Sequence, residues 1–323
     1  TALASAFPNT ASALGGLRLA GLAAVSRIVG MDCPGRHSLL SRLELAFDGP
    51  PSQELAYRVV RHQALAAPLR LEVHGAGISG SVGAFFLSPP PEQARAAEVA
   101  RLVRPGEFSG QNALVVGGSR GLGEVAAKIL AAGGAKMTLS YHRGEADARR
   151  VAADIAEAGG SCGVTALDVT DAPGTRAALQ SLTPRPSHVY YFATPHIAVN
   201  RSGVFDQSLH RTFLRHYADA FTELCVSLAT PGPVRVFYPS TVFIEAPPKD
   251  LAEYARAKAA GEAVCQALAR RHPHLSFVVQ RLPRLRTDQN QGLLSRQSAD
   301  PLPILLAAVR EMNTPTKESA DHA

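Results

Sequence analysis

The feature that most constrains the fold is the segment ALVVGGSRGLGE, residues 113–124, in which glycines separate an apolar run from a helical pattern. The run is typical of a buried strand, and Leu122, Val125, Ile129 and Leu130 repeat at helical spacing. Glycines at such a junction allow a tight turn and a close approach of the backbone to a phosphate at the helix N-terminus. The sequence therefore predicts a strand, a glycine turn and a helix that bind a dinucleotide.

Downstream of this turn, strand-like and helical segments alternate. Such alternation is typical of a parallel sheet with helices on both faces, so we expect a Rossmann-type doubly wound α/β domain over residues 111–323. The expected strands are residues 112–117, 135–141, 162–169, 188–194, 234–240 and 276–282. No final strand is expected after residue 287.

The preceding residues follow a different pattern. Apolar residues repeat at helical spacing over residues 17–31. Four strand-like runs follow, at residues 38–47, 55–61, 69–75 and 80–87. A helix followed by an antiparallel sheet predicts a smaller α+β domain over residues 1–91. Prolines and glycines then indicate a linker over residues 92–110.

Composition limits the classes of function. The 323 residues are 46% hydrophobic and 19% charged, which suffices for two cores. The net charge of +6 comes without an aromatic-basic stripe, so we expect no nucleic-acid partner, although the positive field favours small anionic ligands. The four cysteines lack the paired spacing of a zinc site or a disulfide framework, so we expect no metal and a reducing, cytoplasmic location. No apolar run has the length of a membrane span, so no membrane partner is expected.

The end of the second expected strand indicates which dinucleotide binds. The segment LSYHRG, residues 139–144, has no Asp or Glu that could accept a hydrogen bond from a ribose 2′-hydroxyl. Arg143 stands there instead, and Arg120 stands inside the glycine turn. Because a guanidinium can pair with a 2′-phosphate, the sequence predicts NADP(H) rather than NAD.

A second motif lies further along the chain. Tyr254 and Lys258 are one helical turn apart in YARAK, and Ser240 ends a strand 14 residues before Tyr254. With the glycine turn and LDVT, these motifs make residues 111–287 resemble the short-chain dehydrogenase/reductase family. The resemblance implies that hydride comes from the nicotinamide, Tyr254 transfers the proton at the carbonyl oxygen, Ser240 hydrogen-bonds that oxygen and Lys258 holds the nicotinamide ribose. The Lys258 ammonium is also expected to lower the pKa of the phenol.

The resemblance further implies a set of cofactor-binding residues in the glycine turn, at strand ends and after the sixth strand. They are Gly117, Ser119, Arg120, Gly121, Leu122, Gly123, His142, Arg143, Asp168, Val169, Ala193, Tyr254, Lys258 and Pro283. Among them, Asp168 is assigned to the adenine ring.

The chain departs from the family pattern at three places. FATPH stands where the family has Asn-Ala-Gly, and the helix TFLRHYADAFTEL lacks the family's catalytic Asn, with His216 or Tyr217 nearby. PRLRT, residues 283–287, stands where the family has a PG…T motif. We therefore expect a changed proton relay, a changed substrate lid and a changed sheet edge.

Residues 14–90 resemble the MaoC-like enoyl hydratases, which have the hotdog fold, through the glycine-flanked helix and the strand that follows it. In that family an Asp and a His in a loop before the helix activate water or take the α-proton, but AFPNTASALGG contains neither. We expect a domain that serves dimerisation or acyl binding; alternatively, the catalytic loop precedes Thr1. His37 is either a surviving catalytic group or a structural His at a strand end.

Together the two resemblances favour an NADPH-dependent reductase of 3-oxoacyl thioesters of coenzyme A or an acyl carrier protein, as in fatty-acid or polyketide synthesis. Arg281, Arg284 and Arg286 are candidate contacts for the substrate phosphates. Two alternatives stay open: a short-chain reductase of another ketone, sugar or polyol, and a non-catalytic NADP-binding sensor or scaffold. A homodimer or higher homo-oligomer is expected.

Overall fold

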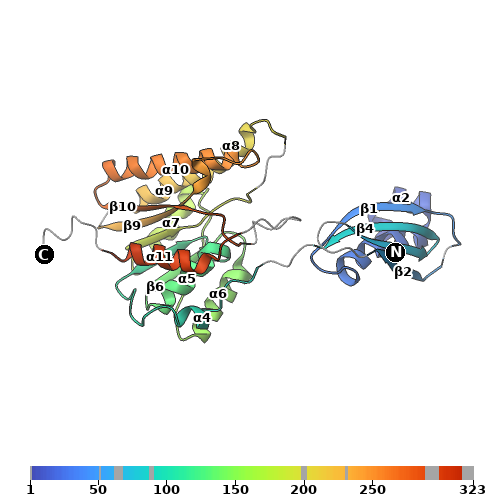
Figure 1. Ribbon diagram of the computed structural model, residues 1–323, viewed down its shortest axis with the longest axis horizontal. Helices are drawn as coiled ribbons and strands as arrows, with labels where there is room; N and C mark the ends of the chain where they lie inside the picture. The colour runs from blue at the N-terminus through green and yellow to red at the C-terminus, as the bar shows by residue number, and fades with distance from the viewer. Residues whose placement is uncertain are drawn as a thin grey trace. The chain divides into compact units, whose positions relative to one another are not determined.

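The computed structural model describes residues 2–50, 52–61, 68–86, 91–197, 202–229, 232–287 and 298–314. The chain forms two compact units, one built on the residues before 91 and the other on the residues from 91 onward. Figure 1 shows both units and labels many of their elements.

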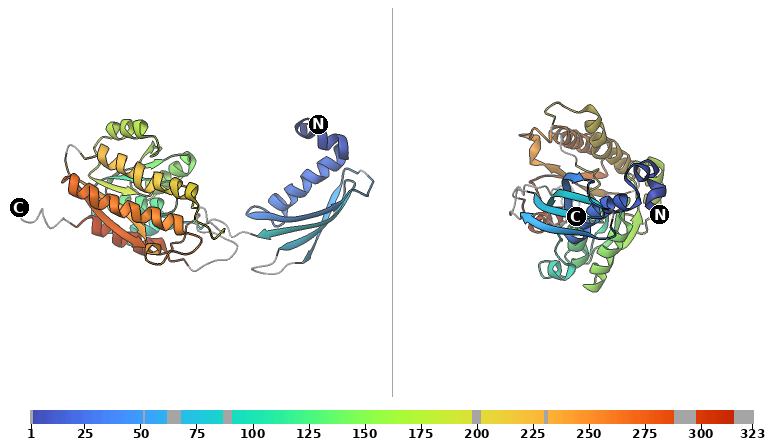
Figure 2. Two further views of the ribbon diagram at one scale, coloured as in Figure 1. Left: turned by 90° about the horizontal axis from the view of Figure 1, so that it is seen from above. Right: turned by 90° about the vertical axis from the view of Figure 1, so that its right-hand side faces the viewer.

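The first unit is a helical segment packed on an antiparallel sheet (Figure 2). The helices are α1 (Ala2–Ala6), α2 (Pro8–Leu14) and α3 (Gly16–Arg27), and α3 continues into the π-helical turn η1 (Ile28–Asp32). The strands are β1 (Ser38–Ala46), β2 (Leu55–Arg61), β3 (Leu69–Gly75) and β4 (Ile78–Phe86), in the order β1-β4-β3-β2. The predicted helix, strands and α+β class are therefore confirmed, whereas the hotdog fold stays a prediction.

Alternating side chains explain the core of the first unit. Along β3, Leu69, Leu71 and Val73 are buried beneath the helix, while Arg70 between them is exposed. The period of two is what a strand with one solvated face requires. His37, the candidate catalytic group, is exposed and has φ 61° just before β1.

The second unit contains a six-stranded parallel sheet in the order β10-β9-β8-β5-β6-β7. Its strands are β5 (Asn112–Val116), β6 (Lys136–Tyr141), β7 (Gly163–Ala166), β8 (His188–Tyr191), β9 (Val234–Thr241) and β10 (Leu275–Leu282). The strand order reverses at β5, which lies between β6 and β8, and ligands of such sheets bind at the carboxyl ends of the strands at this point. The predicted doubly wound fold is confirmed, and within the described residues no seventh strand joins the sheet.

Helices cover both faces of this sheet (Figure 1). One face carries α4 (Ala96–Ala100), α5 (Gly121–Ala132), α6 (Glu145–Glu157) and α11 (Pro301–Met312). The other carries α7 (Ala172–Ser181), α9 (Ala220–Ser227) and α10 (Ala252–Arg271). Along β5, Ala113 and Val115 enter the first core and Leu114 and Val116 the second, as expected for a strand buried on both faces.

Residues 92–110, which we expected to form a linker, belong to the second unit. The side chain of Phe108 is completely buried in the core around α5. Lys128 of α5 donates a hydrogen bond to the carbonyl oxygen of Ala94 at 2.9 Å, and Asp154 of α6 accepts one from the amide of Ala96 at 3.1 Å. The linker prediction was wrong because the segment's apolar residues pack on α5 and α6.

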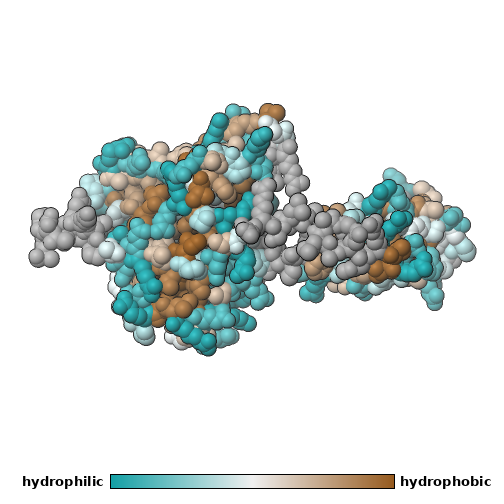
Figure 3. Space-filling view, viewed as in Figure 1, coloured by the Kyte–Doolittle hydropathy of each residue, from teal (hydrophilic) through white to brown (hydrophobic). Residues whose placement is uncertain are grey.

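The surface of both units mixes polar and apolar residues, as the face drawn in Figure 3 shows. In the described part of the chain, no single helix is long and apolar enough to cross a membrane; α2 with α3 and η1 meets that criterion only as a pair bent by 113°. The same residues contain no cluster of three His, Cys, Asp or Glu side chains placed to hold a metal ion.

Candidate active site

The glycine turn joins β5 to α5 as predicted, at the carboxyl edge of the sheet. Gly117 has φ 79°, and a Cβ atom on Gly123 would lie 2.2 Å from the carbonyl oxygen of Gly117, so neither position tolerates a side chain without strain. Arg120 occupies the N-cap position of α5 and makes no side-chain cap hydrogen bond. The first amides of α5 therefore lack a side-chain cap, and such amides bind anions.

The ends of neighbouring strands lie against this turn. A Cβ atom on Gly117 would be 3.0 Å from the amide of Ala193, which follows β8. Asp168, after β7, accepts hydrogen bonds from the amide and hydroxyl of Thr170 and lies 3.4 Å from Nδ1 of His142. These predicted cofactor-binding residues therefore share one edge of the sheet.

The remaining predicted cofactor residues lie close in sequence to the same edge. Ser119, Gly121 and Leu122 are part of the turn or the first turn of α5. Val169 is buried in the core next to Asp168, and Pro283 is exposed just beyond β10.

The two arginines expected at the 2′-phosphate differ in their surroundings. Arg120 pairs with Asp147 of α6, Nε to Oδ2 at 3.1 Å. Arg143 is exposed, and no ion pair with it occurs among the described residues. Arg143 therefore has the guanidinium that is free to meet an additional phosphate.

Tyr254 lies in the first turn of α10 within an aromatic cluster. Its ring meets Phe213 of α8 (Gln207–Leu214) and Tyr217 edge-on, with both centroid distances 5.8 Å. Its phenol shares a hydrogen bond with the hydroxyl of Thr241, the last residue of β9. Burial raises the pKa of Tyr254 to about 12, against the effect of that hydrogen bond. The expected lowering of the phenol pKa by Lys258 is not what this structure shows, because burial dominates.

The Ser240 hydroxyl binds a carboxylate rather than the phenol of Tyr254. This hydroxyl donates to Oε1 of Glu262 on α10 at 2.6 Å, and the same carboxylate accepts two hydrogen bonds from Arg281, at 2.9 and 2.8 Å. Arg281 also donates to Glu245 at 2.9 Å. The hydrogen bonds from Arg281 hold the pKa of Glu262 below its usual range, so the carboxylate is ionised and accepts from Ser240.

The hydroxyl that we missed from the sequence is thus Thr241. The sequence analysis named only Ser240, and because successive residues of a strand point to opposite faces, a difference of one position along β9 decides which hydroxyl faces the phenol. The strand-end position was a usable signal, but spacing along α10 did not tell which of the two hydroxyls would reach the phenol.

Lys258 lies one helical turn beyond Tyr254, as predicted, and is buried. Its ammonium donates to the carbonyl oxygen of Pro239 at 2.7 Å. It lies over the ring of Tyr217 at 4.0 Å from the centroid and over Tyr238 at 5.0 Å. Burial lowers the pKa of Lys258 to about 7, so the charge of this group changes near neutral pH.

The helix that lacks the family's Asn contains a π-helical turn, η2 (Arg215–Asp219), between α8 and α9. His216 turns its Nδ1 to the carbonyl oxygen of Thr212 at 3.0 Å. Tyr217 is buried, and its hydroxyl lies 2.5 Å from that of Thr194 after β8. Of the two residues considered at this position, Tyr217 is the one that contacts Tyr254 and Lys258.

The three arginines that we expected to contact the substrate phosphates also differ in their surroundings. Arg281 is held between Glu245 and Glu262, so it is not free for a substrate phosphate. Arg286 lines an open cavity of about 450 Å³, together with Arg95 and Asp300 among others. Arg284 is partly buried, and its carbonyl oxygen accepts from the amide of Ala299.

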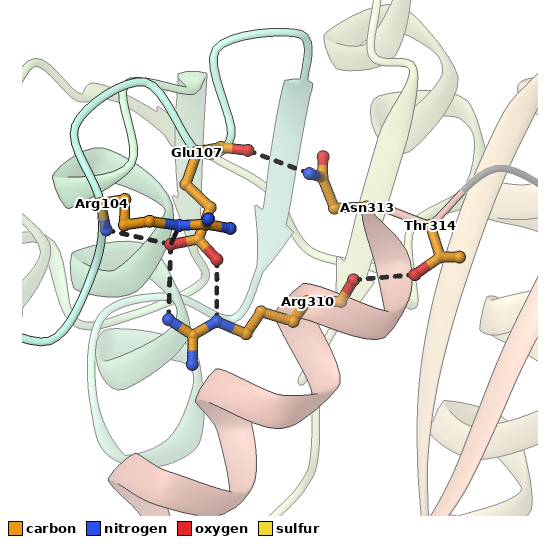
Figure 4. Close-up of a pocket in the computed structure, with 5 residues that line it drawn as sticks. All are labelled: Arg104, Glu107, Arg310, Asn313 and Thr314. Atoms are coloured by element: carbon orange, nitrogen blue, oxygen red, sulfur yellow. Dashed lines mark hydrogen bonds and ion pairs between the residues drawn. The ribbon is translucent and has the colours of Figure 1, made fainter.

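A smaller cavity of about 290 Å³ lies between the end of α11 and the loop before β5 (Figure 4). Its polar groups bind each other: Arg310 donates to Glu107 at 2.8 Å, and Asn313 donates to the carbonyl oxygen of Glu107 at 2.9 Å. We interpret this cavity as a structural contact between α11 and the loop before β5 rather than a ligand site, because the hydrogen bonds of Glu107 are already made by its protein partners.

Comparison with known proteins agrees with this geometry. Residues 111–193 match the family model described as short chain dehydrogenase. An uncharacterized oxidoreductase of Methylorubrum extorquens is 32% identical over 127 residues, which are 38% of this chain and 49% of that protein. The match thus spans about half the length of this relative.

Solved structures show the same fold. A short chain dehydrogenase from Burkholderia cenocepacia in complex with NADP has a TM-score of 0.57 at 23% identity, covering 65% of this chain and 92% of that one. An oxidoreductase from E. coli has a TM-score of 0.58 at 20% identity, with coverage of 65% and 92%. An angucycline C-6 ketoreductase with bound NADP has a TM-score of 0.54 at 20% identity, with coverage of 64% and 90%.

Proposed function

We propose that this chain is an NADPH-dependent carbonyl reductase of the short-chain dehydrogenase type. The observation that carries the proposal is the pairing of the Tyr254 phenol with the Thr241 hydroxyl at the carboxyl end of β9. This pair lies at the same edge of the sheet as the glycine turn between β5 and α5. A proton donor and a nucleotide-binding turn at one edge are what reduction of a carbonyl group needs.

The residues present fit NADP(H). The uncapped amides of α5 suit the pyrophosphate, and the unpaired guanidinium of Arg143 suits the 2′-phosphate. The Burkholderia dehydrogenase and the angucycline ketoreductase of the same fold were crystallised with NADP, which supports this choice.

The nicotinamide, when bound, supplies the hydride to the carbonyl carbon. Tyr254 gives its phenolic proton to the carbonyl oxygen, so that the ketone gains one hydride and one proton and becomes an alcohol. Thr241 holds the phenol in place and hydrogen-bonds the same oxygen, which stabilises the negative charge that develops there. Lys258, one turn along α10, is the residue that would hold the nicotinamide ribose, as the family resemblance implies.

The substrate class that we propose is a 3-oxoacyl thioester of coenzyme A or a carrier protein. Support comes from the first unit, whose helix and antiparallel sheet suit the resemblance to hydratases that act on enoyl thioesters. Arg286 is a candidate contact for an anionic group, but Glu92, Glu98 and Asp300 line the same cavity, so its charge alone does not favour an anion. Arg281 gives no such support, because two carboxylates neutralise it.

A second candidate is a nucleotide-binding sensor without turnover. One observation favours it: burial raises the pKa of Tyr254 to about 12, so the protonated phenol is a weak proton donor, and burial lowers the pKa of Lys258 to about 7, so its ammonium is only partly charged at neutral pH. Reduction of a substrate requires that cofactor and substrate make the phenol a stronger proton donor.

The two candidates are separated by following NADPH oxidation with acetoacetyl-CoA and a panel of simple ketones, using the wild type and Tyr254→Phe. The reductase proposal expects turnover that falls about 100-fold or more in Tyr254→Phe, since the proton is lost while the ring stays, and unchanged NADPH binding. Undiminished turnover in the variant contradicts the assignment of Tyr254. Tight NADPH binding without turnover of any substrate supports the sensor.

A further inference from the structure

The ammonium of Lys258 is enclosed by aromatic rings rather than by carboxylates. The nitrogen of the ammonium lies 4.0 Å from the ring centroid of Tyr217 in η2 and 5.0 Å from that of Tyr238 in β9. The ammonium donates its hydrogen bond to the carbonyl oxygen of Pro239. No carboxylate among the described residues forms an ion pair with it. A buried ammonium normally needs such a partner, because the loss of hydration disfavours its charge.

Lys128 provides the contrast within the same unit. It is equally buried, but Glu124 and Asp154 each lie 2.8 Å from its ammonium. The chain thus contains two buried lysines whose charge is stabilised in different ways. Two carboxylates stabilise the charge of Lys128, whereas the electron-rich faces of two aromatic rings stabilise the charge of Lys258.

The local structure is built to keep the Tyr217 ring in place. In η2 the amide of Ala220 bonds to the carbonyl oxygen of Arg215, which is the wider spacing of a π-helical turn. Two phenols from the sheet bind carbonyl oxygens of this turn: Tyr191 donates to His216 at 2.7 Å, and Tyr238 donates to Tyr217 at 3.2 Å.

The facing helix makes room for this arrangement. A Cβ atom on Gly261 of α10 would lie 1.8 Å from the hydroxyl oxygen of Tyr238 and 2.6 Å from the carbonyl oxygen of Tyr217. Only glycine at this position lets the Tyr238 phenol pass between α10 and η2. The hydroxyl of Tyr217 itself is held 2.5 Å from that of Thr194.

We propose that Tyr217 is a positioning residue whose ring face keeps Lys258 charged inside the protein. The titratable groups that face the ammonium are Tyr217 from η2, Tyr238 from β9 and the Cys265 thiol from α10. Burial holds the pKa values of both phenols and of the thiol above their usual ranges, so these groups are neutral near pH 7. The attraction to Lys258 therefore comes from ring faces and one carbonyl group.

The importance of this charge for turnover rests on the proposed function, but the charge itself can be measured without any substrate. The chain has five lysines, so the spectrum of the protein labelled with ¹³C-lysine contains few signals. The Lys258 signal is the one lost in Lys258→Met, and its chemical shift against pH gives the pKa of the ammonium.

The decisive comparison keeps the size of the ring. Tyr217→Phe retains the aromatic face, so the Lys258 titration should stay as in the wild type. Pentafluorophenylalanine at position 217 has nearly the same shape but an inverted ring quadrupole, so the pKa should fall by about one unit, a tenfold change. Phe213→Leu is the matched control, because Phe213 stacks on Tyr217 at 6.0 Å without being one of the rings over the ammonium.

An unchanged titration with the fluorinated ring overturns the proposal, and so does a raised pKa, which would mean that Tyr217 only excludes water. An equal fall in Phe213→Leu also overturns it, because loss of packing would then explain the shift. If the titration behaves as expected and no substrate is reduced, the aromatic enclosure stands and the proposed function fails.

Discussion

The role of Thr241 can be tested directly, because the neighbouring hydroxyl of Ser240 provides a control. Thr241→Val keeps the shape of the side chain but removes the hydroxyl that reaches Tyr254, so kcat/KM should fall roughly 10- to 100-fold, the worth of one hydrogen bond to a developing charge. Ser240→Ala removes a hydroxyl that serves Glu262, which Arg281 still holds, so kcat/KM should change less than about threefold. Steady-state NADPH oxidation measures both variants. A larger loss of kcat/KM in Ser240→Ala than in Thr241→Val would show that Ser240, and not Thr241, is the hydroxyl that assists Tyr254.

We expect the cofactor preference to depend on Arg143 more than on Arg120. Arg143→Ala should weaken NADPH binding by about tenfold or more and leave NADH binding nearly unchanged, because only the 2′-phosphate needs the guanidinium. Arg120→Ala should have the smaller effect, since Arg120 is already paired with Asp147. Titration calorimetry of both variants with NADPH and NADH measures these affinities. Equal affinities of the wild type for NADPH and NADH would contradict the assignment.

The residues of the site could be predicted only in part from the sequence. The glycine turn, Asp168 and the spacing of Tyr254 and Lys258 follow from local patterns, and the structure places them as those patterns require. The exchange of Ser240 for Thr241 could not be predicted, because it depends on how the end of β9 meets α10. The pKa of Tyr254 could not be predicted either, because it depends on burial by Phe213 and Tyr217, which are distant in sequence.

Among the secondary-structure elements, α11 is joined to the loop before β5 through the carboxylate of Glu107. Hydrogen bonds from Arg310 lower the pKa of Glu107 to about 2 from an ordinary value of 4.5. Because the folded-state pKa is the lower one, the pair stabilises the fold above about pH 4.5, and this stabilisation is lost as the pH falls towards 2.

Glu107→Gln should therefore lower the melting temperature at pH 7 by a few degrees. The loss corresponds to about 1 kcal/mol, since Arg310 is half exposed and solvent screens the pair. The difference in stability between wild type and variant should shrink as the pH falls from 4.5 to 2. Arg149→Gln, which breaks an exposed pair with Glu145 within α6, is the control and should change the melting temperature little. Thermal unfolding followed by circular dichroism across this pH range tests the expectation.

The elements themselves were largely predictable, and the failure at residues 92–110 has a clear cause. Strand and helix periodicity depend on each segment alone, so the strands of both units were found within a few residues. The expected linker contains the same proline and glycine signals as a true linker. Its inclusion in the second unit depends on residues distant in sequence: its apolar side chains, such as Phe108, pack on α5 and α6, and Lys128 and Asp154 bind its backbone.

For the whole molecule, the first unit is expected to lack hydratase activity. Its residues before α3 form α1 and α2 and contain no Asp or His, and His37 is an exposed residue before β1. Without the Asp and His of that loop, this position offers no general base to activate water for addition to an enoyl thioester. Crotonyl-CoA should therefore keep its absorbance when the protein is added. A steady loss of this absorbance would show that another residue supplies the base.

The substrate class is also a property of the whole chain, because both units and the charged surface bear on it. A thioester of coenzyme A or a carrier protein has phosphates far from the reacting carbonyl, and binding energy gained there can be used to stabilise the transition state. Acetoacetyl-CoA should therefore be reduced with a kcat/KM about 10-fold or more above that of ethyl acetoacetate.

Replacing Arg284 and Arg286 together by Ala should narrow this ratio without affecting the simple ester, since Arg286 lines the open cavity and Arg281 is already neutralised. Arg271→Ala, at the far end of α10, is the matched control and should leave the ratio unchanged. If simple ketones or sugars react as well as the thioester, the chain is a reductase of another substrate class.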